Sequence, residues 1–130
     1  MSGPVEVSWG LSGSDANDAI IKFARAYTGR QYLVAFTGAY HGSTYGSMSL
    51  SSISMNMSRK MAPLLPGVVK VPFPSPWERE PDESEEHFVD RFFREFMRPF
   101  ETYLPAEETA VILMEAIQAT VGSARRRLPL

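Results

Sequence analysis

The first third of the chain passes from a strand-like to a helix-like spacing of apolar residues. Apolar and polar residues alternate from Val5 to Trp9, which is the period of a half-buried strand. From about residue 15 to residue 28, apolar positions recur every three or four residues, as on an amphipathic helix, and Gly29 is suited to end it. The apolar run Tyr32–Phe36 is too short for a helix and predicts a buried strand. Together these segments predict a βαβ unit with a parallel, right-handed crossover.

Further helices and strands are expected in the rest of the chain. A short helix is expected from Thr44 to Ser51, a strand at Val68–Val71 and a further buried strand at Ala110–Met114. The acidic stretch 78–86 predicts an exposed loop that leads into a helix. The core-facing stripe of that helix comprises Phe88, Phe92, Phe96, Phe100 and Leu104. Pro99 is expected to kink or end the helix, because proline has no N–H and clashes with the preceding turn.

Serine and methionine dominate residues 44–61, which carry few charges. Methionine commonly fills irregular gaps in a core. The same apolar content in a loop-like segment is also typical of a subunit interface. The pattern leaves both interpretations open.

Composition narrows the classes of partner. The chain has 130 residues, 44% hydrophobic and 22% charged, which is usual for one globular domain. Its net charge of −2 supplies no general field for nucleic acid or membrane lipid, so neither is expected as a partner. The basic run Arg125–Arg127 is better explained as a solvated tail than as a nucleic-acid contact. The sequence has no cysteine and no apolar run long enough to span a membrane, and Met1–Pro4 lacks the pattern of a signal peptide. We therefore expect a soluble, cytoplasmic protein.

A turn of small residues, Leu11–Asn17, lies between the first predicted strand and the helix. Ser14 or Asp15 can cap that helix. The first amides of a helix have no intrahelical partner and lie at the positive end of its dipole, so a phosphate fits such a turn. An ordinary capped turn, in which glycine and serine serve only the geometry, is the alternative.

Two other candidate groups are expected at the same edge of the sheet. The loop Thr37–Thr44 follows the second predicted strand, and its Tyr40 and His41 can stand beside the turn, where a flat aromatic ligand could stack. Packing of Tyr40 against the helix and a purely polar role for His41 are the alternatives. Glu115 lies at the carboxyl end of the last strand, which is the ligand side of an α/β sheet, although a solvated strand end explains it equally.

Four motifs, in order and spacing, resemble the class III (ω-amino acid) pyridoxal phosphate-dependent aminotransferases. They are Ser12–Asn17, Ala24–Arg30, Ala39–Gly46 and Pro63–Gly67. The runs Leu11–Asn17 and Tyr40–Gly46 most resemble the branch that contains 4-aminobutyrate aminotransferases. The resemblance implies an α/β, three-layer fold with a mainly parallel sheet, here the N-terminal part of the large domain of fold type I.

The resemblance also implies a cofactor site for pyridoxal 5′-phosphate. Gly13 and Ser14 match the positions that hold the cofactor phosphate, with Ser12 adjacent; Tyr40 matches the aromatic residue that stacks on the pyridine ring, with His41 beside it. Glu115 matches a glutamate near cofactor and substrate. The family reaction moves an amino group from an amino donor to a 2-oxo acid acceptor, and family members are homodimers.

The resemblance weakens after Glu115, where Ala116 replaces the family's proline and Ala119–Gly122 replaces a run of glycine and acidic residues. The family's Schiff-base lysine, pyridinium-binding aspartate and substrate arginine would lie beyond the last residue. We therefore interpret residues 1–118 as a partial cofactor-binding domain and 119–130 as a divergent tail, from truncation or a shifted reading frame. No catalytic residue is assigned, and the chain alone is expected not to transaminate; a non-catalytic remnant that binds a phosphorylated ligand or a protein is the alternative function.

Overall fold

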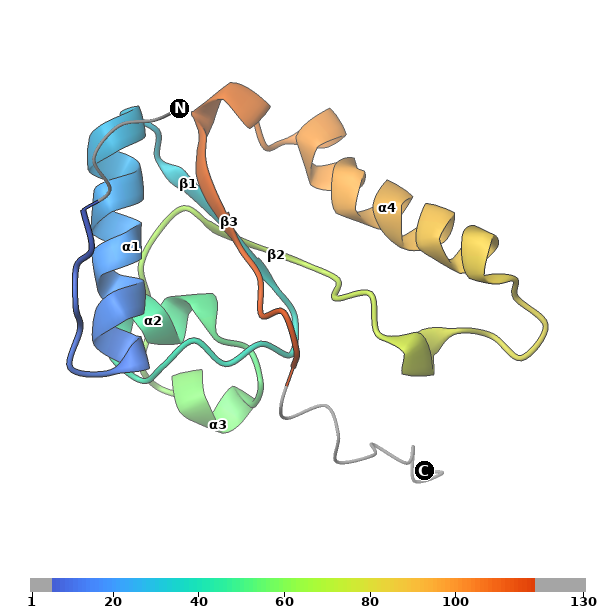
Figure 1. The fold of residues 1–130 in the computed structure, drawn as a ribbon, viewed down its shortest axis with the longest axis horizontal. Helices are drawn as coiled ribbons and strands as arrows, with labels where there is room; N and C mark the ends of the chain where they lie inside the picture. The colour runs from blue at the N-terminus through green and yellow to red at the C-terminus, as the bar shows by residue number, and fades with distance from the viewer. Residues whose placement is uncertain (1–5, 119–130) are drawn as a thin grey trace.

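The computed structural model describes residues 6–118 as one parallel sheet with helices on both faces (Figure 1). Its helices and strands are, in chain order, α1 (Gly13–Thr28), β1 (Tyr32–Phe36), α2 (Tyr45–Leu50), α3 (Met55–Ser58), β2 (Val68–Val71), α4 (Glu85–Thr102) and β3 (Thr109–Leu113). Single turns of 3-10 helix occur at Pro76–Glu78 and Ala106–Glu108. The predicted α/β class and parallel sheet are confirmed.

The three strands lie in the order β2-β1-β3, with β1 in the centre. β1 pairs parallel with both neighbours, so that Leu33 lies opposite Val68 on one side and Val111 on the other. The chain returns from β1 to β2 through α2 and α3, and from β2 to β3 through α4. All three strands therefore end at the same edge of the sheet.

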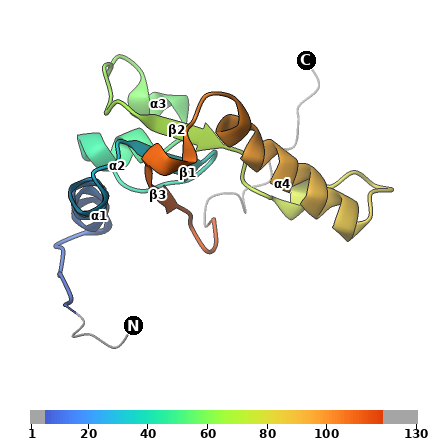
Figure 2. The same ribbon diagram turned by 90° about the horizontal axis from the view of Figure 1, so that it is seen from above.

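Alternate side chains of β1 enter two separate cores, which makes the fold three-layered. On the face covered by α1 and α2, the buried residues are Ile21, Leu33, Ala35, Leu50 and Leu113. On the face covered by α4, they are Val34, Phe36, Val71 and Leu104. Figure 2 shows α1 and α4 on opposite sides of the strands. Three residues of the predicted stripe, Phe96, Phe100 and Leu104, pack in this second core, where Phe96 stacks on Phe36 with ring centroids 6.1 Å apart. Phe88 and Phe92 are also buried and contact each other, with ring centroids 4.8 Å apart.

α1 confirms the predicted helix, which begins two residues earlier than expected, but not the face that it buries. The apolar stripe of Ile20, Phe23 and Tyr27 is exposed, and Ile21 is the buried residue of the helix. Ser12 is the N-cap, and its hydroxyl accepts a hydrogen bond from the amide of Asp15 at 3.2 Å. The cap is therefore neither Ser14 nor Asp15. Gly29 ends the helix with a φ of 66°, in the left-handed region that glycine adopts without strain.

The predicted strand at residues 5–9 is wrong for the part that the structure describes. Residues 6–10 have no regular structure, and the side chain of Trp9 is 90% exposed. The alternating pattern is that of a strand, but no strand of the described sheet pairs with this segment. Residue 5 lies outside the described residues.

Three smaller expectations are also corrected. The helix does not end at Pro99, since α4 continues through it to Thr102. The last strand is not buried on both faces, since Ile112 is 48% exposed. The Met-rich segment contains the predicted short helix as α2, followed by one further turn, α3, where a loop was expected.

Candidate functional site

Three segments meet at the edge where the parallel strands end. They are the beginning of α1, the loop 37–44 that follows β1, and the residues that follow β3. Ligands of α/β sheets bind outside the carboxyl ends of the strands, which is this edge. The six residues singled out from the sequence all belong to these segments.

The beginning of α1 is open and offers backbone amides. The amide of Ala16 makes the first bond of the helix, to the carbonyl of Ser12 at 3.0 Å, so the amides of Gly13 and Ser14 precede the helical ladder. A Cβ added to Gly13 would meet nothing within 4 Å. The hydroxyl of Ser12, in contrast, is engaged in capping. An anion can therefore approach Gly13 and Ser14, where the helix dipole favours negative charge.

The loop after β1 is fastened directly to this end of α1. The amide of Ser43 donates to Ser14 Oγ at 3.1 Å, and Asn17 Nδ2 donates to the carbonyl of His41 at 2.7 Å. Gly42 makes the approach possible, because an added Cβ would lie 2.3 Å from Ser14 Oγ. These contacts hold Tyr40 and His41 beside the open amides.

Two buried polar atoms in the loop region have no hydrogen-bond partner. His41 is 7% exposed and its Nε2 is unpaired within residues 6–118, as is Glu115 Oε2. The other carboxylate oxygen, Glu115 Oε1, accepts a long bond of 3.4 Å from the amide of Tyr40. Burial lowers the pKa of His41, with Lys70 adding to the decrease and Glu115 opposing it, so the imidazole is neutral at pH 7. Unpaired buried atoms of this kind are expected where a ligand completes the site.

The sequence did not single out the residues that support the loop. Ser51 and Ser52, which follow α2, bond to several of its backbone groups, and Lys70 on β2 bonds to the end of α2. The only signal in the sequence is the recurrence of serine at positions 47, 49, 51 and 52, which does not reveal their partners. Tyr40 itself is 47% exposed, and its side chain is available to a ligand.

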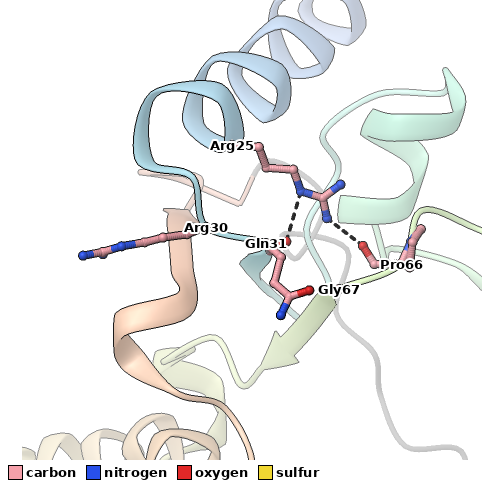
Figure 3. A pocket seen from close by; sticks show the side chains of 5 residues that line it. All are labelled: Arg25, Arg30, Gln31, Pro66 and Gly67. Carbon is pink, nitrogen blue, oxygen red and sulfur yellow. Dashed lines mark hydrogen bonds between the residues drawn. The ribbon is translucent and has the colours of Figure 1, made fainter.

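A cavity of about 250 Å³ lies at the other edge of the sheet, where the strands begin (Figure 3). Arg25 lines it, but its Nε donates to the carbonyl of Gln31 at 3.0 Å and its Nη2 to the carbonyl of Pro66 at 2.7 Å. Arg30 points away from Arg25 and donates to the carbonyl of Thr109 at 3.2 Å. The arginines therefore connect the segments that enter β1, β2 and β3, and this cavity has a structural explanation.

Residues 6–126 match the model of one protein family, aminotransferase class-III. The chain belongs to the class III aminotransferase family. It is 60% identical over 119 residues to an isoleucine 2-epimerase of Lentilactobacillus buchneri, a match that covers 92% of this chain and 26% of that protein. It is 32% identical over 111 residues to a probable 4-aminobutyrate aminotransferase of Bacillus subtilis, covering 85% and 26%. Among solved structures, the PMP-bound form of an aminotransferase from Vibrio fluvialis matches with a TM-score of 0.71 and 30% identity, covering 82% of this chain and 24% of that one.

This class III chain spans about a quarter of the length of the curated relatives it matches. The fold expected from the motifs is confirmed as a partial transaminase fold. Pyridoxal 5′-phosphate is the cofactor that the family and its PMP-bound neighbour indicate. A specificity for 4-aminobutyrate is not established, since the family also includes an epimerase of much higher identity.

The residues present fit the phosphate and one face of this cofactor. The open amides at Gly13 and Ser14 suit a phosphate, and the unpaired His41 Nε2 and Glu115 Oε2 leave polar atoms for a ligand. When bound, pyridoxal phosphate acts as an electron sink for carbanions formed next to an amino group. No helix within residues 6–118 has the length and apolarity needed to cross a membrane.

Proposed function

We propose that this chain binds the phosphate of pyridoxal 5′-phosphate at the beginning of α1 and holds the cofactor ring near Tyr40. The observation that carries the proposal is the direct attachment of the Tyr40–Ser43 loop to an open helix N-terminus, through Ser14 and Asn17. Gly13 and Ser14 supply amide donors to the phosphate. Ser12 orders the turn through its cap. Tyr40 offers an aromatic face.

Two neighbouring groups complete the proposed site. His41 is neutral at pH 7 because burial lowers its pKa, so its imidazole can exchange hydrogen bonds without adding charge beside a phosphate. Glu115 supplies a carboxylate oxygen that no other group among the described residues satisfies. Both residues orient a ligand at the strand ends. Neither is assigned a proton-transfer step.

For the protein as a whole, we propose an amino-acid epimerase rather than a 4-aminobutyrate transaminase. The 60% identity to an isoleucine 2-epimerase supports this, against 32% to the probable 4-aminobutyrate aminotransferase, over similar shares of the chain. Transfer of an amino group from an ω-amino acid to a 2-oxo acid is the second candidate. The homodimer implied by the family resemblance and the cytoplasmic location expected from the composition belong to the same proposal.

The chain alone is expected to bind the cofactor without turnover. Its lysines are Lys22, Lys60 and Lys70. Lys22 is exposed on α1, Lys60 is exposed after α3, and Lys70 donates to the carbonyls of Leu50 and Ser51. None of them is placed as a covalent anchor in the way that the family reaction requires. A non-catalytic, cofactor-binding remnant therefore remains the alternative for this polypeptide.

Titration of the purified 130-residue chain with pyridoxal phosphate tests the cofactor site. We expect saturable binding that inorganic phosphate competes away. Gly13→Leu should weaken binding at least tenfold without loss of fold, since the new side chain begins in open space. Ala26→Leu, on the exposed side of the same helix, is the matched control and should leave the affinity unchanged. Equal affinity of Gly13→Leu and the wild type would exclude the phosphate site.

Borohydride reduction followed by peptide mapping tests the expectation of no turnover. We expect no stoichiometric lysine label. A label on one lysine, together with exchange of the C2 proton of L-isoleucine in deuterated water, would overturn that expectation and support the epimerase. Formation of glutamate from 2-oxoglutarate and 4-aminobutyrate would instead support the transaminase.

A further inference from the structure

Two serines at the end of α2 bind the loop that carries Tyr40. The amide of Gly38 donates to Ser52 Oγ at 3.0 Å, and the amide of Ser52 donates to the carbonyl of Ala39 at 2.8 Å. The amide of His41 donates to Ser51 Oγ at 2.8 Å. The residues on both sides of Tyr40 are therefore fixed to the end of one short helix.

Lys70 fixes the end of that helix to the sheet. Its Nζ donates to the carbonyl of Leu50, the last residue of α2, and to the carbonyl of Ser51 at 3.2 Å. These are C-terminal carbonyls without helical partners, and a lysine side chain is a suitable donor for them. Lys70 lies on β2 opposite Ala35 of β1, whose side chain belongs to the core under α1 and α2.

A lysine at this position carries a desolvation cost, which a residue present only for packing would not have. Burial lowers the pKa of Lys70 to about 8, which means that the fold opposes its charged form. An apolar side chain at this position would fill the same space without that cost. The lysine provides what an apolar residue cannot, namely N–H donors for two carbonyls at the base of the loop.

We propose that Lys70 is a positioning residue of the cofactor site. It holds the end of α2 and with it Ser51 and Ser52, and these two serines hold the loop that carries Tyr40 and His41. This inference rests on the proposed cofactor function. The opposite side of the loop is attached to α1 through Ser14 and Asn17. Lys70 therefore supports the ring-binding side of the site, while its own hydrogen bonds go to Leu50 and Ser51 and not to the phosphate-binding amides of α1.

The experiment compares ring binding with phosphate binding in the full chain. The probes are pyridoxamine 5′-phosphate, which has no aldehyde to react with lysines, and inorganic phosphate. The variants are Lys70→Met, Lys70→Arg and, as a matched loss of one charge from an exposed position, Lys22→Met. The readouts are the two affinities, the circular dichroism induced in the absorption band of bound pyridoxamine phosphate, and amide hydrogen exchange at Gly38 and His41.

We expect Lys70→Met to weaken pyridoxamine phosphate binding about tenfold and to remove most of the induced signal, with inorganic phosphate affinity within twofold of wild type. Exchange at Gly38 and His41 should accelerate at least tenfold, while exchange within α1 stays unchanged. Lys70→Arg, which keeps a long donor, should restore the induced signal, and Lys22→Met should match wild type. If Lys70→Met does not fold, Ser51→Ala should give the same selective loss, because it removes the acceptor of the His41 amide and the hydrogen bonds that Ser51 Oγ donates to the carbonyls of Gly42 and Ser47.

The two proposals fail in different ways. The role of Lys70 would be overturned, and the cofactor site left intact, if Lys70→Met kept the affinity, induced signal and exchange rates of the wild type. The same holds for Ser51→Ala if Lys70→Met does not fold. An equal loss of both affinities would also overturn it, because Lys70 would then support the fold as a whole. Absence of binding of either probe to the wild type would overturn the cofactor site, and the positioning role with it.

Discussion

At the scale of single residues, the candidate site depends on one glycine that has no space for a side chain. Gly42 has a φ of 131°, and an added Cβ would lie 2.5 Å from Ser47 Oγ and 2.8 Å from Ser14 Cα. Relief would require the loop to move away from both α1 and α2. The contact with a backbone carbon matters most, because it cannot be relieved by rotation of a side chain.

We expect Gly42→Ala to lower the free energy of unfolding by about 2 kcal/mol or more, from backbone strain and overpacking. Gly13→Ala is the control: its Cβ meets nothing within 4 Å, and we expect a change of less than about 1 kcal/mol, towards greater stability in a helix. Urea unfolding followed by circular dichroism measures both. Similar effects of the two substitutions would show that the loop does not approach α1 closely in solution.

At the scale of elements, α4 is attached to the preceding acidic stretch through Arg91, which bonds the Glu83 carboxylate and, at 3.1 Å, the carbonyl of Glu78. Arg91 Nε and Nη2 each donate to a carboxylate oxygen of Glu83 at 2.9 Å, and the Arg91 guanidinium lies over the rings of Phe88 and Phe92. The amide of Glu80 also donates to this carboxylate at 3.3 Å. The stretch predicted as an exposed acidic loop is therefore anchored, and Glu83 is its buried residue.

The hydrogen bonds from Arg91 lower the pKa of Glu83 from 4.5 to about 2. A lowered carboxylate pKa contributes stability that is complete above the unfolded value and is lost as the pH falls towards about 2. We expect the melting temperature of Glu83→Gln to lie below that of wild type at pH 6, and the difference to shrink from pH 5 to pH 2. Glu95→Gln removes the exposed partner of Arg91, 3.9 Å away, and should have little effect at any pH. A constant difference between pH 6 and pH 2 would contradict the lowered pKa.

The elements that sequence could predict are those determined by local patterns. β1, β2 and α1 follow from short apolar runs, helical spacing and Gly29. The strand predicted at residues 5–9 has the right local pattern, but a strand also needs a neighbour, and pairing is a property of distant residues.

The same distinction applies to the site. Gly13, Ser14 and Tyr40 were found because turn chemistry and motif spacing are local. The supports at Ser51, Ser52 and Lys70 were missed, since their hydrogen bonds join residues up to 20 positions apart. The continuation of α4 through Pro99 depended on the position of the proline within the last turn, which the phenylalanine pattern does not determine.

At the scale of the whole molecule, the described residues expose large apolar side chains on the outer side of α1. Ile20, Phe23 and Tyr27 recur at helical spacing, and Phe23 and Tyr27 are 58% and 94% exposed. A contiguous apolar stripe of this kind on a free surface favours association. The chain spans about a quarter of the length of the isoleucine 2-epimerase that it matches.

We therefore expect the purified chain to self-associate through α1, and the double substitution Phe23→Ser, Tyr27→Ser to shift it towards the monomer. Both side chains are exposed, so their loss removes apolar surface from the outside without opening the core beneath Ile21. Trp77→Ser is the control, because that side chain is 83% exposed but lies in a 3-10 turn away from the helix. Light scattering after size exclusion, over a hundredfold range of concentration, measures the mass. A monomeric wild type throughout, or an equal shift with Trp77→Ser, would show that the stripe on α1 does not drive association.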